Sequence, residues 1–564
     1  MAPKPRTLRL FDDLDAARTQ KAVVALTGAG VSDILLLEDG RKTQILKALA
    51  AYAEQRGMQT VHYSQGWGVE YIMARGASDQ KGEAPGRRLM NTDEQFAALI
   101  DHLRNSEAAT LVILDWVDIL LQDAGSVSDA QAVIIQRLAA LPGDGLFRNH
   151  RHLMVMLVRN GQLNRRLSEF PGVVSVTLPI PDEEERHIAI NQMVADPHNT
   201  LRLDPTFSPE RAIRSSGGLY LDDLTRLRDL SATTPITEQL LVERKNAAIR
   251  RQGGDTLMVH DTAGYGPDRI AGMHGLKLAL TDMESAGVRQ PRILLAGPAG
   301  CGKSTAHRFV ANHRGEPAVE LDHVRERWVG ASEERMDQAW QTVEALSPVC
   351  LFLDECEAEL GRRSSTGGDE SRTDSSLRSK MFNHLGDTGT QNNGSVIAAT
   401  NRIDLMDEAA VDRFTVVPVI HPVGDECVEI MSIQAARSNR RLDFDSVKKA
   451  MAGAGTMSGR QLVRLLDRAA VHAGRRGSTV IEGADVANAL AESMYRLSAG
   501  EVFQAMLAIR HTSFTPYLPW NAAAARGQER RWPDYMDGLV NPDGSLWLDQ
   551  LDAKLDELVK AGAR

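Results

Sequence analysis

A glycine-rich segment that ends in a lysine and a serine is the strongest chemical signal in the sequence. Residues 297–304 fit the pattern G-x-x-x-x-G-K-[ST] at every position. Glycines let backbone N–H groups and a helix start face an anion, while Lys303 would reach the β and γ phosphates and Ser304 would hold Mg²⁺. The segment predicts a loop that binds a nucleoside triphosphate, made by Gly297, Pro298, Ala299, Gly300, Cys301, Gly302, Lys303, Ser304 and Thr305.

Two apolar runs downstream end in polar side chains that suit hydrolysis. Residues 349–353 precede Asp354 and Glu355, and residues 395–400 precede Asn401. The carboxyl ends of parallel strands meet at the edge of a sheet where ligands bind. We expect Asp354 to orient Mg²⁺, Glu355 to activate the attacking water, and Asn401 to position that water beside the γ-phosphate.

The elements around these motifs resemble a known family. In this order, residues 297–304, 351–355 and 398–402 resemble the AAA subgroup of AAA+ ATPases, over about residues 270–494. The resemblance implies a large α/β domain followed by a small helical lid. It also implies ATP and Mg²⁺ as ligands, and a homo-oligomeric ring that is most simply a hexamer.

The resemblance assigns roles to residues outside these motifs. Ile270 and Ala271 match the segment that packs on adenine. Arg413 matches the finger that reaches the γ-phosphate of a neighbouring subunit, a role that suits the permanently charged, planar guanidinium. Arg460 would contact phosphate from the lid, and Arg464 is the alternative.

A second set of residues resembles the parts that grip a client. Trp328 and Val329 match the pore loop of remodelling enzymes. The large apolar face of a tryptophan suits this role, since it can hold any polypeptide without selectivity. The alternative is a tryptophan that packs in the core. Residues 362–376, which are rich in Ser, Gly, Asp and Arg, are interpreted as a further pore loop.

The first half repeats the pattern of the second half and lacks its chemistry. Residues 110–116, 152–160, 174–182 and 215–226 align in order with the corresponding segments of the second half, which indicates a duplication. The apolar run 33–37 is expected to be the strand before a vestigial phosphate loop, in which Glu38 and Asp39 would repel phosphate and only Lys42 and Thr43 match. Trp116 takes the place of the base, so we expect a scaffold without hydrolysis.

This layout resembles the AAA proteins of cyanobacteria and plastids that have a degenerate first half and an intact second half. The predicted fold is α/β, with two tandem AAA+ modules, each a parallel sheet with a small helical lid. The expected domains are 1–232 (degenerate module), 233–262 (linker), 263–422 (large ATPase domain), 423–499 (lid) and 500–564 (C-terminal extension).

The C-terminal extension leaves two interpretations open. Residues 514–520 hold three aromatics and two prolines, and leucines over 546–558 suggest a terminal helix. Either the extension packs on its own ATPase domain, or it is a handle for a partner.

Composition limits the function. The net charge of −10 makes a nucleic-acid partner unlikely, and no apolar run is long enough to span a bilayer. The four cysteines lack metal-ligand spacing and favour a reducing compartment, so we expect a cytoplasmic protein. The leading hypothesis is a ring ATPase that remodels an unidentified protein client, and the alternative is a nucleotide-gated scaffold. The sequence contains no H-E-x-x-H motif, so no proteolysis is expected.

Overall fold

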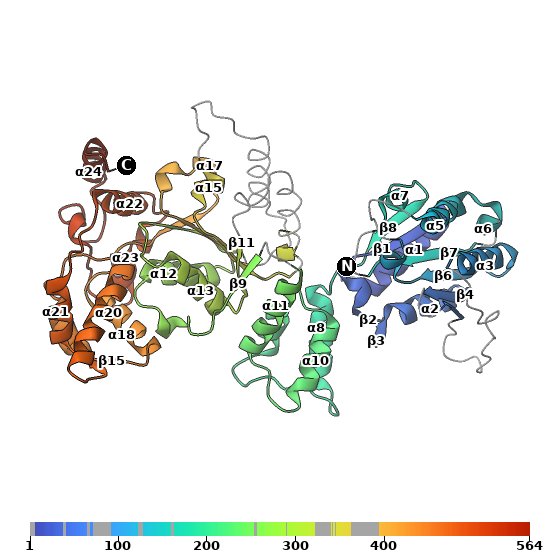
Figure 1. The fold of residues 1–564 in the computed structure, drawn as a ribbon, viewed down its shortest axis with the longest axis horizontal. Helices are drawn as coiled ribbons and strands as arrows, with labels where there is room; N and C mark the ends of the chain where they lie inside the picture. The colour runs from blue at the N-terminus through green and yellow to red at the C-terminus, as the bar shows by residue number, and fades with distance from the viewer. Residues whose placement is uncertain are drawn as a thin grey trace. The chain divides into compact units, whose positions relative to one another are not determined.

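The chain forms two compact units, residues 1–237 and 238–564, which are described separately (Figure 1). In the described part of the chain, no helix has the length and apolar character needed to cross a membrane. Trp328, Val329 and the segment 362–376 lie outside the described residues. The computed structural model describes residues 6–37, 41–64, 68–71, 92–121, 128–149, 151–159, 163–252, 257–288, 290–321, 340, 342–344, 346–361 and 394–563.

The second unit is built on a six-stranded sheet of order β14-β10-β13-β12-β11-β9. All neighbouring strands are parallel except β9, which pairs antiparallel with β11 at one edge. The central strands are continuous apolar runs because helices cover both faces of a parallel sheet. The strands are β9 (Leu257–His260), β10 (Arg292–Ala296), β11 (Ala318–Leu321), β12 (Cys350–Leu353), β13 (Val396–Thr400) and β14 (Thr415–Pro418).

Successive residues of these strands feed two separate cores, as the pleat of a strand requires. On one face, Ile293 and Leu295 pack with α12 (His274–Ser285) and α13 (Lys303–Arg314). On the other face, Leu294 and Ala296 pack with α11 (Glu238–Gln252). The short helices α15 (Glu357–Leu360) and α17 (Glu408–Val411) follow β12 and β13.

A helical subdomain, the region predicted to be the lid and called the lid below, follows the last strand of this sheet. Its core is a separate cluster in which α20 contributes Leu462, Leu465 and Leu466 from one face. Ser458 caps α20 in a capping box with Gln461, which fixes where this helix begins. The lid helices are α18 (Asp425–Arg437), α19 (Phe444–Met451), α20 (Gly459–Arg475) and α21 (Gly483–Glu492), with the short strands β15 (Arg441–Leu442) and β16 (Val480–Ile481).

The C-terminal extension packs on the sheet domain of the second unit, as the first of the two interpretations expects. Trp520 is 1% exposed and shares a core with Ile420, which follows β14. The Trp520 indole N–H donates to the carbonyl oxygen of Gly544 at 2.8 Å, so its polar group is satisfied. The helices of the extension are α22 (Ala499–Arg510), α23 (Pro519–Ala525) and α24 (Leu548–Lys560).

The predicted linker, residues 233–262, contains elements of the second unit. Helix α11 buries Ala248 and Ile249 in the core of that unit, and the Lys245 ammonium donates to the carbonyl oxygen of Pro348 at 2.7 Å. Strand β9 is the edge strand of its sheet. An amphipathic helix and an isolated short strand give a weak sequence signal when their packing partners lie far along the chain.

The first unit contains a six-stranded sheet of order β5-β4-β6-β7-β1-β8. Its strands are parallel except β5, which pairs antiparallel with β4 at one edge. The strands are β1 (Val23–Thr27), β4 (Gln59–Ser64), β5 (Gly68–Tyr71), β6 (Thr110–Leu114), β7 (Leu153–Leu157) and β8 (Val173–Thr177). The helices are α1 (Arg6–Gln20), α2 (Ile45–Gln55), α3 (Thr92–Asn105), α4 (Val117–Leu120), α5 (Asp129–Ala140), α6 (Gly145–Asn149), α7 (Arg165–Ser168), α8 (Glu183–Ala195), α9 (Pro209–Ser215) and α10 (Leu221–Ser231).

The prediction that residues 33–37 form the strand before a vestigial phosphate loop is wrong. Within this run, β2 (Ile34–Leu36) pairs antiparallel with β3 (Lys42–Gln44) in a two-stranded sheet outside the main one. Strand β1 occupies the place in the main sheet that was assigned to this run. Leu35 and Leu36 are apolar because they are buried beside α1, and the sequence does not separate this packing from that of a central strand. Glu38 and Asp39 lie outside the described residues.

Candidate active site

The glycine-rich loop joins β10 to α13 and holds conformations that suit glycine. Gly297 has φ of 152°, and a Cβ there would lie 2.1 Å from the carbonyl oxygen of Val419. Gly302 precedes the first turn of α13 with φ of 101°. The loop therefore leads directly into the N-terminus of a helix, where free N–H groups favour an anion.

Lys303 lies under this loop, and its side chain is almost entirely buried. Its ammonium donates to the carbonyl oxygens of Gly297 at 2.8 Å and Pro298 at 2.9 Å. Burial lowers the pKa of Lys303 because the charged form loses solvation, and the positive charge of Arg460 acts in the same direction. An anion in the loop would favour the charged form and offset this cost.

The predicted carboxylates stand at the end of β12. Burial raises the pKa of Asp354, whereas Glu355 is exposed. Glu355 has φ of 45°, and its backbone N–H donates to Asp354 Oδ1 at 3.0 Å. A positive φ is uncommon for a residue with a side chain, and the tight turn holds the two carboxyl groups at the strand tip.

These residues surround one cavity of about 410 Å³. Asn401, at the end of β13, is also part of its wall. Gly297 and Pro298, the first two residues of the loop, are not part of this wall. The predicted residues that line the cavity are Ile270, Ala271, Ala299, Gly300, Cys301, Gly302, Lys303, Ser304, Thr305, Asp354, Glu355, Asn401 and Arg460.

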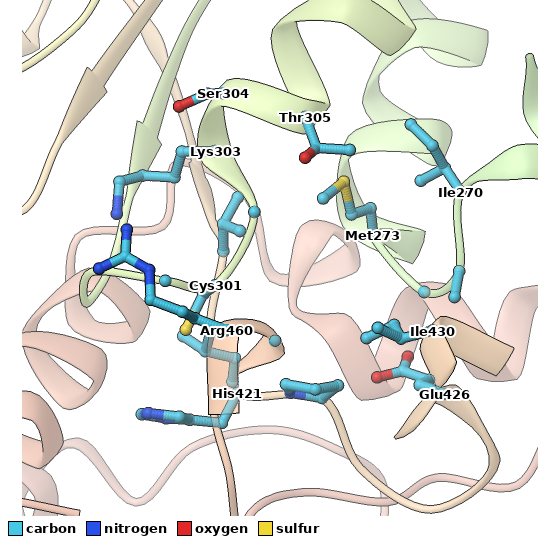
Figure 2. A pocket seen from close by; sticks show the side chains of 18 of the residues that line it. Ile270, Met273, Cys301, Lys303, Ser304, Thr305, His421, Glu426, Ile430 and Arg460 are labelled. Carbon is cyan, nitrogen blue, oxygen red and sulfur yellow. The ribbon is translucent and has the colours of Figure 1, made fainter. Parts of the chain in front are cut away.

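The cavity has a polar end at the phosphate loop and an opposite end where apolar side chains lie together with the Glu426 carboxylate (Figure 2). Ser304 and Lys303 lie at the polar end, while Ile270, Met273 and Ile430 lie on the opposite side. The Lys277 ammonium holds the segment before α12 by donating to the carbonyl oxygen of Ile270 at 2.8 Å. An elongated ligand with a charged end and a flat apolar end matches this division.

The lid closes the cavity through the start of α20. The backbone N–H of Arg460 donates to the carbonyl oxygen of Gly300 at 3.0 Å, so the lid is bonded to the phosphate loop. Figure 2 shows the Arg460 side chain directed toward Lys303, consistent with its effect on the pKa of that lysine. The alternative residue, Arg464, is exposed and is not part of the cavity wall.

Arg413, the predicted arginine finger, is not part of this cavity wall. It follows α17, and its guanidinium donates to the carbonyl oxygen of Ala409 in the preceding turn. The predicted grip residues Trp328 and Val329 fall outside the described part of the chain.

Several wall residues escaped the sequence analysis. Apart from Met273, which closely follows Ile270 and Ala271, they come from the helix α18, from the segment after β14 and from the C-terminal extension, and no motif marks these because only tertiary packing brings them to the loop. They include Met273, His421, Glu426, Ile430, Ile433, Gln434, Arg437 and Pro519.

The first unit repeats the strand-tip geometry with different side chains. Trp116 follows Asp115 with φ of 57°, and its backbone N–H donates to Asp115 Oδ1 at 2.9 Å, as Glu355 does to Asp354. The Trp116 ring is 39% exposed and cannot accept a proton from water. The backbone turn is therefore repeated without the basic group.

An arginine of the first unit stands at the position of Asn401. Leu353 pairs with Ala398 three residues before Asn401, and Leu114 pairs with Met156 three residues before Arg159. The Arg159 guanidinium forms a two-point ion pair with Asp115, with Nε–Oδ1 at 2.7 Å and Nη2–Oδ2 at 2.9 Å. The pKa of Asp115 falls to about 2 because hydrogen bonds from His62 and Arg159, together with their charges, outweigh the opposing effect of burial. The Asp115 carboxylate is therefore already paired with the Arg159 side chain.

The loop after β1 also holds an internal cation. Gly28 follows β1 as Gly297 follows β10, and a Cβ there would lie 2.7 Å from the carbonyl oxygen of Leu178. A few residues further on, Asp33 accepts from Arg6 Nη2 at 3.0 Å. Arg6 is 1% exposed, and its guanidinium also bonds the Glu185 carboxylate. Charged side chains of the chain itself therefore fill this region of the first unit.

Comparison with known proteins gives the same assignment for the second unit. Residues 293–421 match the family "ATPase family associated with various cellular activities (AAA)". The chain is 33% identical over 239 residues to an ATP-dependent zinc metalloprotease FtsH of Acidimicrobium ferrooxidans, covering 39% of this chain and 35% of the relative. It is 32% identical over 230 residues to the chloroplastic FTSH 2 of Oryza sativa subsp. japonica, covering 38% and 32%.

A third relative is the ATP-dependent zinc metalloprotease FtsH 3 of Synechocystis sp., 30% identical over 244 residues, covering 39% of this chain and 38% of the relative. The chain thus spans about a third of the length of the curated relatives it matches. The family match includes the phosphate loop, both strand tips and Pro418 at the end of β14, all of which contribute to the cavity wall. The C-terminal half of the chain thus contains a domain of the AAA ATPase family.

Proposed function

We propose that the chain hydrolyses ATP in the cavity of the second unit and uses the energy to remodel a protein client as a homo-oligomeric ring. One observation carries the proposal. The cavity brings a phosphate loop together with Asp354, Glu355 and Asn401, although these lie about 50 and 100 residues beyond the loop in the sequence.

The residues present fit an ATP–Mg²⁺ complex. Gly300 and Gly302 have φ of 81° and 101°, conformations with which a loop can turn its backbone N–H groups toward phosphate, and the buried ammonium of Lys303 would gain a counter-charge there. Ser304 and Asp354 would hold Mg²⁺, which supplies charge neutralisation on the phosphates when bound. Ile270 lies at the end opposite the phosphate loop, where a purine ring would pack, and Ala271 lines the same cavity.

The side chains divide the hydrolytic work by position. Glu355 is the general base for the attacking water, since its exposed carboxylate borders the cavity. Asn401 would orient that water from the neighbouring strand tip. Arg460 would neutralise phosphate from the lid of the same chain, and Arg413 would do so from a neighbouring subunit. Trp328 and Val329 remain our candidates for contact with the client.

Replacement of Lys303 tests the nucleotide site itself. Lys303→Ala removes the ammonium that serves the β and γ phosphates, so we expect ATP affinity to fall about 10- to 100-fold, the range for a charged hydrogen bond. Titration of the full chain with a fluorescent ATP analogue measures the Kd. Lys448→Ala is the matched control, because Lys448 pairs with Asp425 at the surface of the lid. Equal affinities of the wild type and Lys303→Ala would overturn the assignment of the loop.

We further propose that the first unit is a second AAA-like module that does not bind nucleotide. Its sheet has the same order of parallel strands as the second sheet, which supports a common origin. Asp115 is held by Arg159, and Arg6 supplies an internal cation beside the loop after β1. A module whose metal-binding and phosphate-binding positions contain such pairs serves as a scaffold.

Removal of the buried cation should destabilise this module strongly. Arg6→Ala leaves Asp33 and Glu185 buried without their counter-charge, and breaking a buried ion pair costs about 3–5 kcal/mol. Burial raises the pKa of both carboxyls already, and Arg6 opposes this rise. Without Arg6 their folded-state pKa values rise further above the unfolded values, so stability is lost as the pH increases. The deficit should therefore be larger at pH 8 than at pH 5.

Hydrogen–deuterium exchange of peptides from β1 and β8 in the full chain measures this effect within the first unit. Arg9→Ala is the matched control on the same helix, because Arg9 and Asp182 form an exposed ion pair worth less than about 1 kcal/mol. If the amides of β1 and β8 exchanged no faster in Arg6→Ala than in Arg9→Ala at pH 8, Arg6 would not be needed for the stability of the module.

A further inference from the structure

The C-terminal extension contributes to the wall of the ATP cavity. Pro519, the first residue of α23, lines the cavity, and α23 packs beside α12. A Cβ on Gly275, near the start of α12, would lie 2.1 Å from the carbonyl oxygen of Tyr517, so the backbone of the extension touches this helix directly. The extension is thus fixed to the large domain next to the segment that holds Ile270.

The same extension also contacts the lid. Thr456 and Asp534 form a hydrogen bond between Oγ1 and Oδ2 at 3.3 Å, two residues before the cap of α20. A Cβ on Gly424 would lie 2.8 Å from Arg531 Nη1. Gly424 has φ of 56° and precedes α18, where the chain passes from the sheet into the lid. Residues 531–534 therefore contact the lid at its entry and beside the helix that meets the phosphate loop.

Between these contacts, Tyr535 holds the segment that follows β14. Its hydroxyl lies 3.1 Å from His421 Nδ1, and the two rings meet edge to face with centroids 5.6 Å apart. His421 is 2% exposed, and burial lowers its pKa to about 4, so the ring is neutral at neutral pH. Burial also raises the pKa of Tyr535 far above its usual value, so the phenol keeps its proton. A hydrogen bond between two neutral groups costs little to bury.

The segment held in this way supports the phosphate loop. Residues 418–422 all line the cavity, and the Val419 carbonyl oxygen is the atom closest to a Cβ placed on Gly297. A shift of His421 would therefore move the surface on which the loop rests. A site whose wall is fixed before binding loses less free energy to ordering when the ligand enters.

We propose that the C-terminal extension, residues 498–563, is a positioning element of the ATP site, which holds the lid and residues 418–422 in the arrangement that binds nucleotide. Tyr535 and Asp534 are its positioning residues. The inference rests on the proposed ATPase function and adds a role for the extension. The competing view is that the extension only buries its own core around Trp520.

Two single variants and one control separate these views in the full chain. Tyr535→Phe keeps the ring and removes the hydroxyl on His421, and Asp534→Asn weakens the exposed bond to Thr456. Asp552→Asn is the matched control, because Asp552 pairs with Arg510 inside the extension. ATP hydrolysis gives KM and kcat, titration with a fluorescent ATP analogue gives Kd, and thermal unfolding without nucleotide gives Tm.

We expect Tyr535→Phe to raise KM and Kd by about three- to tenfold, as the loss of one hydrogen bond implies. Asp534→Asn should raise both in the same direction by a smaller factor, because its bond is exposed. We expect kcat to stay within about twofold, since Glu355 and Asn401 stand on strands outside the extension. Asp552→Asn should leave KM and Kd unchanged.

Two outcomes would overturn the inference. A lower Tm with unchanged KM and Kd in Tyr535→Phe and Asp534→Asn would reduce the extension to a packing role. Equal rises in KM for Asp552→Asn would show general loosening of the domain. A wild-type chain that neither binds nor hydrolyses ATP would instead remove the proposed function, and the inference with it, so the two failures are distinguishable.

Discussion

The Glu355→Gln protein is expected to bind ATP as the wild type does and to hydrolyse it about 100- to 10,000-fold more slowly, the range for loss of a general base. The amide keeps the size and the turn of Glu355 at the tip of β12, where the backbone N–H is bonded to Asp354. The negative charge and with it the ability to accept a proton are removed. Steady-state release of phosphate measures hydrolysis, and titration with a fluorescent ATP analogue measures binding.

The matched control is Glu284→Gln. Glu284 pairs with His313 at the surface of α12 and α13, away from the cavity wall. Its turnover should equal that of the wild type. Normal turnover of Glu355→Gln would remove Glu355 as the base, whereas loss of ATP binding would mean that the carboxylate has a structural role.

The Glu355→Gln protein is also the means to identify the client. A ring that binds ATP and does not split it should retain whatever polypeptide it holds. Affinity capture from cells with ATP present, compared with the Lys303→Ala protein, would separate nucleotide-dependent partners from contaminants. The resemblance to FtsH proteases covers about two fifths of this chain, so the client must come from such an experiment.

The sequence predicted which residues lie together at the phosphate-loop end of the cavity because that end is built from local motifs. The phosphate loop and the tips of β12 and β13 each pair an apolar strand with adjacent polar residues, and a parallel sheet brings such tips together. Ile270 and Ala271 likewise line the cavity. A short motif that carries its own backbone geometry can be recognised without knowledge of the packing.

The remaining parts of the site depend on contacts between distant segments. The cavity wall includes Gln434 from the lid, His421 from the segment after β14 and Pro519 from the extension. The sequence around each of these residues contains no motif that indicates a ligand site. The run at residues 33–37 was assigned to the wrong sheet for the same reason. Strands β1 and β2 are both buried and both apolar in sequence. Only their pairing partners, β7 for β1 and β3 for β2, show which of them belongs to the main sheet.

The sequence predicts from Trp116 that the first unit does not hydrolyse nucleotide, and the structure adds an ion pair that supports this prediction. From the sequence alone, Arg159 is placed only within an aligned segment. The register of β6 and β7 shows that Arg159 occupies the position that corresponds to Asn401. Its ion pair with Asp115 then accounts for the missing acidic pair. A side chain such as Arg159, which pairs with a carboxylate that could otherwise bind a metal, is not found by motif comparison because no motif describes it.

Complementation between two inactive variants is the sharpest expectation for the ring. Arg413 follows α17 and does not line the cavity of its own chain, so its proposed partner is the γ-phosphate of an adjacent subunit. Arg413→Ala alone should therefore lower hydrolysis about 1,000-fold or more, as removal of an arginine finger does. Glu355→Gln alone should be similarly inactive, yet its Arg413 is intact.

When these two proteins are mixed in equal amounts and allowed to exchange subunits, activity should return. A site works when an Arg413→Ala subunit, whose cavity is intact, receives the arginine of a Glu355→Gln neighbour. With random assembly head to tail, about a quarter of all sites meet this condition. Phosphate release by the mixture, compared with each variant alone at the same total concentration, measures the recovery.

A mixture of Arg413→Ala with Arg468→Ala provides the reference for subunit exchange. Arg468 lies on the lid and pairs with Glu492 of the same chain, so its sites are expected to work whenever a neighbour supplies Arg413. If that mixture assembles and the complementing pair stays inactive, Arg413 acts within its own chain or not at all. Because each variant is defective in a different residue, recovered activity can arise only from a site shared between two copies.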